Sequence, residues 1–124
     1  MKSFKEFLFE SMGININDKE YPWSDMILDK QKTIETRNTD SLGSYVGKKV
    51  GIIRTGKGKA TLVGYMVLGE PIVYKTEEEF KKDYNKHKVP FELNGGVKYG
   101  YPITNVEKCL PREINSKGIV ARRI

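Results

Sequence analysis

The stretch DKQKTIETRN, residues 29–38, poses the question that the fold must answer. Its β-branched residues favour a strand, yet Lys32, Glu35 and Arg37 crowd around the single apolar side chain of Ile34. A strand buried on both faces would exclude these charges, because burying an unpaired charge is costly. The segment therefore predicts a strand at the edge of a sheet. Its charges either line a polar pocket or keep an exposed edge from aggregating.

Period-2 geometry assigns the side chains of this predicted strand to two faces. The faces are Thr33, Glu35 and Arg37 on one side and Lys32, Ile34 and Thr36 on the other. In a pocket, Lys32 or Arg37 would bind an anion, and Glu35 would accept a hydrogen bond from a base or orient a water molecule. The residues alone leave the pocket and the protected edge both open.

The composition is that of one soluble globular domain of 124 residues, with 38% hydrophobic and 31% charged residues. The formal net charge of +6 favours an anionic partner such as nucleic acid, or simply gives solubility. No apolar run is long enough to span a bilayer, and charges interrupt the N-terminus where a secretory signal would be apolar. We therefore expect no membrane partner.

Cysteine and histidine usage limits the chemistry. The single cysteine, Cys109, excludes an internal disulfide and fits a reducing compartment. One Cys and one His are too few for a zinc site, which takes three or four such ligands, so we expect no metal and no cofactor. His87 ends a charged helical segment and is expected to be solvated.

The pattern of apolar residues predicts many short strands and few helices. A capping box, Thr76 and Glu79, marks the start of the clearest helix. The expected helices cover 3–12, 21–30 and 76–87; the strands cover 33–37, 48–55, 60–74, 101–109 and 118–124; residues 14–20 and 91–100 are expected to be linker, turn or loop. This order predicts an α+β fold with a small, curled, mixed sheet or barrel.

The segment WSDMILDKQKTIETRN, residues 23–38, resembles the signature of the ASCH domain family, in which a short helix leads into Gly-x-Lys-Thr-x-Glu-x-Arg. The matching residues are Lys32, Thr33, Glu35 and Arg37. Lys30 and Gln31 stand where the family often has glycine. The later elements follow in the order that the family has, so the resemblance extends over residues 20–124.

This resemblance implies a PUA-like fold, a small curled mixed β-barrel with flanking short helices, and a cleft lined by the Lys/Glu/Arg segment. It also implies binding of RNA or a modified nucleoside. Some relatives are hydrolases, among them an amidohydrolase of acetylated cytidine and a ribonuclease. If this chain is an enzyme, its candidate catalytic residues are Lys32, Thr33 and Glu35. The amidohydrolase branch has its Thr nucleophile two residues after the Thr of the motif, where this chain has Glu35.

A second basic segment, RTGKGK at residues 54–59, predicts a hairpin that could contact a phosphate backbone or be a solvated turn. It is not a nucleoside-triphosphate loop, because Gly58 replaces the Ser or Thr that would bind magnesium. Tyr101 could stack on a base or pack in the core. The candidate nucleic-acid contacts are Lys32, Arg37, Arg54, Lys57, Lys59 and Tyr101. Trp23 is expected to anchor the core close to the cleft.

The N-terminal segment MKSFKEFLFES resembles the capsid-targeting leader of internal head proteins from T-even-type phages. Cleavage would fall between Glu10 and Ser11, after an apolar-x-Glu site. Residues 1–10 would then be a cleavable leader and 11–19 a linker to the domain. The alternative is an ordinary amphipathic helix packed on the domain.

Three functions follow from these patterns. The first is nucleic-acid binding by an ASCH-like domain, probed by its salt dependence. The second is an injected phage protein, held in the virion and then active in the host cytoplasm, that binds and inhibits a host defence protein. The third is a hydrolase acting on RNA or a modified nucleoside.

Overall fold

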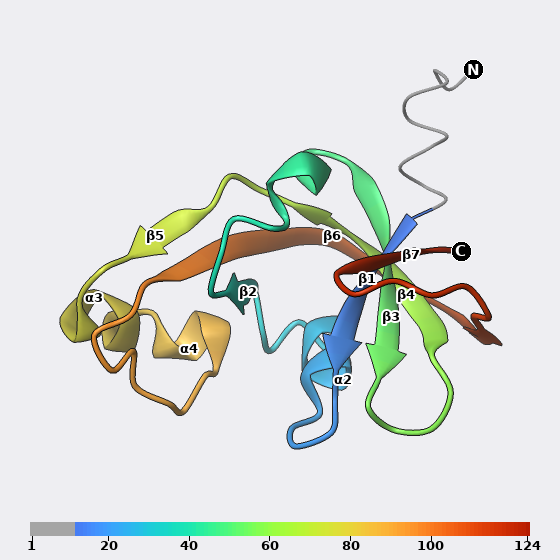
Figure 1. The fold of residues 1–124 in the computed structure, drawn as a ribbon, viewed down its shortest axis with the longest axis horizontal. Coiled ribbons are helices and arrows are strands. Elements are labelled where there is room, and N and C mark those ends of the chain that lie inside the picture. Colours follow the sequence, from blue (N-terminus) through green and yellow to red (C-terminus); the bar gives the residue numbers. More distant parts are fainter. Residues whose placement is uncertain (1–11) are drawn as a thin grey trace.

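One long strand, β6 (Lys98–Glu113), organises the sheet in the computed structural model, which describes residues 12–124. Its first part pairs with β2 and β5, and the rest pairs with β4 (Figure 1). The strand order is β2-β6-β4-β3-β1-β7, with β5 also paired to β6. The sheet is mixed, because β1 runs parallel to β3 while the other pairs are antiparallel. This curled mixed sheet with short helices confirms the predicted fold class.

Most observed helices and strands lie within the expected ranges, but β6 begins inside the expected loop 91–100 and extends beyond the expected strand 101–109. The remaining strands are β1 (Met12–Asn17), β2 (Ile34–Arg37), β3 (Lys49–Thr55), β4 (Thr61–Leu68), β5 (Ile72–Tyr74) and β7 (Ala121–Arg123); the helices are α2 (Trp23–Leu28), the 3-10 helix η1 (Gly43–Tyr45), α3 (Glu77–Lys82) and α4 (Tyr84–His87). The expected strand 60–74 is divided into β4 and β5. In the described part of the chain, no helix has the length and apolar character needed to cross a membrane.

The expected linker or turn over residues 14–20 is wrong, since β1 is an internal strand between β3 and β7. Ile14 and Ile16 are buried, and Asn15 and Asn17 alternate with them, which is the period of a half-buried strand. The expected leader and cleavage site lie outside the described residues. So does the expected helix 3–12, apart from Met12, which belongs to β1.

The main core lies between the sheet and α2. Ile14, Ile27 and Ile52 are fully buried there and pack in one cluster. Burial of one such side chain stabilises the fold by about 1.5–3 kcal/mol. Ser24 and Ile27 are the buried residues of α2, so this helix presents one face to the core. Trp23 packs against the edge of the same cluster.

The expected helix 76–87 forms as two short helices, α3 and α4. The N-cap half of its capping box is confirmed, because the Thr76 hydroxyl accepts a hydrogen bond from the Glu79 N–H at 3.2 Å. The Glu79 carboxylate accepts from the Thr76 hydroxyl at 2.9 Å. The expectation that His87 is solvated is wrong. Its ring is fully buried, stacks on Phe80 with 4.1 Å between ring centroids, and accepts a hydrogen bond from the Val89 N–H at 2.9 Å.

The turn after α2 explains the glycine that the ASCH signature often carries there. The Lys30 N–H donates to the Ile27 carbonyl at 3.0 Å, and the Gln31 N–H donates to the Met26 carbonyl at 2.9 Å. This pair of bonds is a Schellman motif, whose left-handed position favours glycine. Lys30 occupies that position with φ of 62°.

Candidate functional site

An open pocket of about 380 Å³ lies where β1, β2 and the C-terminal segment meet. Its polar residues come from four strands, and one aromatic side chain adds an apolar surface. These residues are Asn15 and Asn17 of β1, Glu35 and Arg37 of β2, Thr55 of β3, Arg122 of β7, and Trp23 of α2. The predicted edge strand, β2, therefore contributes to a polar pocket, which was one of the two interpretations of its charges.

Glu35 and Arg37 form an ion pair in the wall of this pocket. The Arg37 Nη2 lies 2.9 Å and its Nε 3.1 Å from the Glu35 Oε2, and the same Nη2 donates to the Asn15 carbonyl at 2.8 Å. Within residues 12–124, these contacts leave the Arg37 Nη1 for a ligand. The pair is about four-fifths buried or more, with side-chain exposures of 10% and 21%, so water screens it weakly.

Lys32 lies beneath the pocket rather than in its wall. Its side chain is 1% exposed, and its ammonium donates to the His87 carbonyl and lies 4.8 Å from the centre of the Trp23 ring. Burial lowers the pKa of Lys32, and the nearby Glu35 carboxylate opposes this shift. Lys32 was expected on the face opposite Glu35, but its Nζ lies 3.7 Å from the Glu35 Oε1. The alternation fails because β2 begins only at Ile34.

Asn15 connects the pocket to the C-terminal segment. Its Nδ2 donates to the carbonyls of Gly118 and Ile119 at 2.9 and 3.0 Å, and its Oδ1 accepts from the Arg122 Nε at 3.0 Å. The Arg122 Nη1 donates to the Ser116 carbonyl at 3.2 Å. These bonds fix the Arg122 guanidinium at the pocket and, among the described residues, leave its Nη2 for a ligand.

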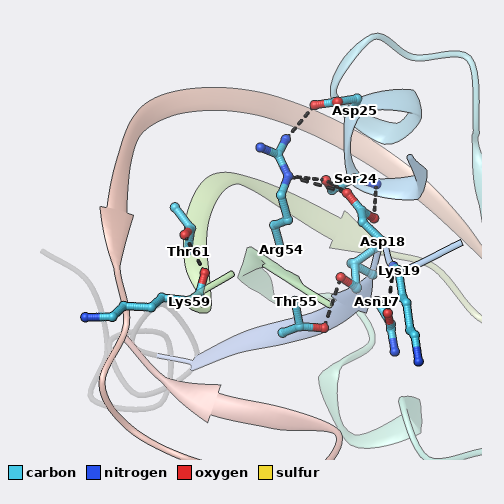
Figure 2. A network of polar contacts seen from close by, with 10 residues as sticks. Asn17, Asp18, Lys19, Ser24, Asp25, Arg54, Thr55, Lys59 and Thr61 are labelled. Carbon is cyan, nitrogen blue, oxygen red and sulfur yellow. Dashed lines mark hydrogen bonds and ion pairs between the residues drawn. The ribbon is translucent and has the colours of Figure 1, made fainter. Parts of the chain in front are cut away.

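Arg54 belongs to a separate polar network that includes the start of α2 (Figure 2). Its Nε donates to the Ser24 hydroxyl at 2.9 Å and lies 3.4 Å from the Asp18 Oδ2, and its Nη2 pairs with Asp25. The Ser24 hydroxyl in turn donates to Asp18, which is 2% exposed. Arg54 thus joins β3 to the start of α2, and it does not line the pocket.

The other predicted contacts are spread over the molecule. Tyr101 is fully buried in the main core, so the alternative of a stacking platform is wrong and that of a core residue holds. Thr33 is exposed, and it lies outside the pocket. Lys57 and Lys59 are exposed on the β3–β4 hairpin. Lys59 pairs with Glu113 at 3.0 Å and points away from the Arg54 network in Figure 2.

Sequence reasoning missed Asn15, Asn17 and Arg122 as site residues. The period-2 pattern ININ at residues 14–17 could have placed both asparagines on one strand face. Arg122 had no such signal, because its partner Asn15 is 107 residues away along the chain. In the described part of the chain, no group of three His, Cys, Asp or Glu residues could bind a metal ion.

The chemistry of the pocket suits a ligand that has a flat ring and both donors and acceptors. Trp23 offers an aromatic face, Glu35 a carboxylate acceptor, and Arg37 and Arg122 two guanidinium donors. Two positive groups against one negative group also favour an anionic ligand. The amide of Asn17 adds a donor, since its Oδ1 already accepts from the Lys19 N–H at 2.9 Å.

Comparison with known proteins identifies the fold. No family model matches the sequence, and no curated protein matches it. Three similar solved structures are of the ASCH protein from Zymomonas mobilis. A serine-to-alanine variant matches with a TM-score of 0.71 and 11% identity, covering 94% of this chain and 89% of that chain. The unmodified protein matches with a TM-score of 0.70 and 9% identity, covering 93% of this chain and 87% of that chain. A tyrosine-to-phenylalanine variant matches with a TM-score of 0.68 and 13% identity, covering 85% of this chain and 76% of that chain. The chain has the PUA-like fold of these ASCH proteins.

Proposed function

We propose that this protein binds RNA and holds one nucleoside, standard or modified, in the pocket between β1 and β2. The observation that carries the proposal is the placement of the Trp23 ring beside the Glu35–Arg37 pair in one pocket. The likeness of the fold to ASCH proteins supports it.

The base would be recognised by stacking and by its edge. A base stacked on an aromatic side chain contributes about 1–3 kcal/mol, and Trp23 provides that surface. The Glu35 Oε1 would accept a hydrogen bond from an exocyclic amine or ring N–H, and the Arg37 Nη1 would donate to a ring carbonyl. Hydrogen bonds to charged groups contribute about 1.5–3 kcal/mol each, so these two would select among bases.

The phosphate groups would be bound by basic residues of the pocket and of the β3–β4 hairpin. Arg122 is already held in the pocket by Asn15. Lys57 and Lys59 lie two and four residues after Thr55, which lines the same pocket. The net charge of +6 supports a general attraction to RNA.

The test is equilibrium binding of short single-stranded RNA to the full chain over a salt series. The variants are Arg37→Ala and Arg122→Ala. The matched control is Lys108→Ala, which removes a cation whose only described pairing is an exposed one with Asp29 at 3.2 Å. We expect a loss of about 10-fold or more for Arg37→Ala and a smaller slope against salt for Arg122→Ala. RNA binding that neither variant weakens would refute the proposal.

Hydrolysis of the bound nucleoside is a second candidate, favoured by one observation. Lys32 is a buried amine with a lowered pKa next to the pocket, which is typical of a general base. We expect product from RNA or an acylated nucleoside that disappears in Lys32→Met. Product that persists in this variant would exclude a role for the amine.

The injected inhibitor of a host defence protein is a third candidate, and it rests on Leu8, Phe9 and Glu10 followed by Ser11. It predicts that protein from purified phage particles has an intact mass that starts at Ser11, and that it forms a host complex resistant to RNase. A mass that starts at Met1, or absence from the particles, would contradict it.

A further inference from the structure

Three aromatic rings lead away from the pocket in an unbroken row. The centre of the Trp23 ring lies 5.0 Å from that of Tyr21, and the Tyr21 ring lies 5.6 Å from Phe91 in an edge-on arrangement. Tyr21 precedes α2, whereas Phe91 comes from the loop between α4 and β6. Segments 70 residues apart thus build one surface, which we call the aromatic track.

The aromatic track is continuous with the pocket. A smaller hollow of about 170 Å³ is lined by all three rings, and it shares Asn17 and Trp23 with the main pocket. Beyond Phe91 lies another hollow of about 420 Å³, whose lining includes Tyr84. The main pocket and the smaller hollow therefore adjoin at Asn17 and Trp23.

The outer two rings lie outside the core. Phe91 is 52% exposed and Tyr21 is half-buried, and neither belongs to a core cluster of the described residues. A single exposed aromatic residue needs no explanation, but Phe91 ends a row of ring contacts that begins at Trp23 in the pocket. The track adjoins a site that already carries a ring and charged groups, which argues for one shared ligand.

The charges beside the track are balanced. Lys19 and Glu20 both line the small hollow, and Lys81 and Glu92 lie 3.5 Å apart next to Phe91. A surface for a phosphate backbone alone would be predominantly basic. Aromatic rings with little net charge instead suit the faces of unpaired bases, since every base has a face that stacks.

We propose that the aromatic track binds the nucleotides that flank the one in the pocket, so that the ligand is single-stranded RNA of at least three nucleotides. Tyr21 and Phe91 each stack on one base. The Asn17 Nδ2, between the pocket and the first of these rings, donates to a ribose 2′-hydroxyl. In a duplex the bases already stack on one another and cannot reach the rings. This inference rests on the proposed function and specifies its ligand.

The test compares the affinity of the full chain for nucleoside 5′-monophosphates with that for five-nucleotide homopolymers of U, C and A. We expect the best homopolymer to bind about 10-fold or more tighter than its mononucleotide, from one or two additional stacked bases. The DNA pentamer of the same sequence is expected to bind more weakly, since it lacks the 2′-hydroxyl.

Substitutions assign the gain in affinity to the rings. Phe91→Ala and Tyr21→Ala should each reduce the pentamer affinity by about 5-fold or more and leave the mononucleotide affinity unchanged. Phe91→Leu keeps an apolar side chain without a ring and should behave like Phe91→Ala, whereas Phe91→Trp should retain the affinity. Leu110→Ala removes a side chain that is 91% exposed on β6 and serves as the matched control.

The outcomes separate this inference from the proposed function. If mononucleotide and pentamer bind equally well, the aromatic track has no role although the pocket does. The same conclusion follows if Phe91→Ala leaves the pentamer affinity intact, and a protein partner would then be the better occupant of the rings. Equal binding of the DNA pentamer would overturn the choice of RNA. If no nucleotide binds at all, the proposed function itself fails.

Discussion

Two arginines near α2 each use Nε and Nη2 in hydrogen bonds or ion pairs, but only one of them lines the pocket. Arg54 is held by Asp18, Ser24 and Asp25, which together occupy its Nε and Nη2 and fix the start of the helix. Arg37 is held by Glu35 and the Asn15 carbonyl, but its pairing forms part of the wall of a pocket. The first group, which we call the closed group, does not line the pocket, whereas the second group does.

This difference separates a structural role from a binding role. The sequence predicted both arginines as contacts for nucleic acid. What distinguishes them is the position of their partners, since Asp18 and Ser24 are buried under Arg54, whereas Glu35 lines the pocket together with Arg37. A charged residue thus gains a candidate function from the unused hydrogen-bonding capacity beside a cavity, not from its charge.

The largest effect on the free energy of unfolding is expected from the substitution of Asp18 in the closed group. Asp18→Ala removes the acceptor of the Ser24 N–H, at 3.0 Å, and the partner of Arg54. Loss of one partner of a buried ion pair costs about 3–5 kcal/mol, so we expect the free energy of unfolding in urea to fall by about 3 kcal/mol. Asp29→Ala, at an exposed ion pair, is the control and should cost less than about 1 kcal/mol. Equal effects would mean that the closed group is not structural.

Alanine substitutions of Arg54 and Arg37 test the comparison directly. Arg54→Ala should lower the free energy of unfolding by about 1–2 kcal/mol, because it leaves polar groups unpaired, and should change RNA affinity less than about threefold. Arg37→Ala should lower RNA affinity about 10-fold or more with the smaller effect on unfolding. Urea denaturation and fluorescence anisotropy of labelled RNA measure the two quantities. The reverse pattern would show that the two groups have been assigned the wrong way round.

The free energy of unfolding should depend on pH through His87, whose carbonyl accepts a hydrogen bond from Lys32 beneath the pocket. Burial lowers the pKa of His87, the only histidine, below its usual 6.5. Below about pH 6.5 the unfolded chain binds a proton that the folded chain does not, so stability is complete above this pH and falls as the pH drops toward the folded-state pKa. The slope is at most about 1.4 kcal/mol per pH unit for one proton.

Urea denaturation at several pH values between 5 and 7.5 measures this slope. His87→Gln cannot titrate and serves as the control, in which the dependence should disappear even if the variant is less stable at every pH. A wild-type stability that does not change with pH over this range would contradict the burial of a neutral His87.

The smallest effect is expected at Lys30, outside both groups. Its φ of 62° places a non-glycine residue in the left-handed region, which costs roughly 1 kcal/mol. Lys30→Gly should therefore raise the free energy of unfolding by about 0.5–1 kcal/mol without changing RNA affinity. Lys30→Ala keeps the strain and is the control. A loss of stability in Lys30→Gly would show that the flexibility of glycine in the unfolded chain outweighs the strain.

The sequence was sufficient for most strands of this fold, but not for β1, and for half of the pocket. The alternation from Ile34 to Arg37 and the N-cap at Thr76 are local signals, and both predicted the observed structure. The pairing of Arg122 with Asn15 joins residues far apart in the sequence, so no pattern of neighbouring residues could predict it. Lys32 shows a third case. It lies just before β2, so its side chain does not follow the alternation of that strand and lies on the same side as Glu35.

The most direct measurement is a titration of the intrinsic fluorescence of Trp23 with single-stranded RNA. Trp23 is the only tryptophan in the chain and lines the pocket, so its emission reports on this site. We expect saturable quenching in the wild-type protein, from stacking of a base on the indole, and weaker binding by about 10-fold or more in Arg37→Ala. RNA that binds, as anisotropy would show, without changing the Trp23 emission would place the ligand elsewhere and contradict the account.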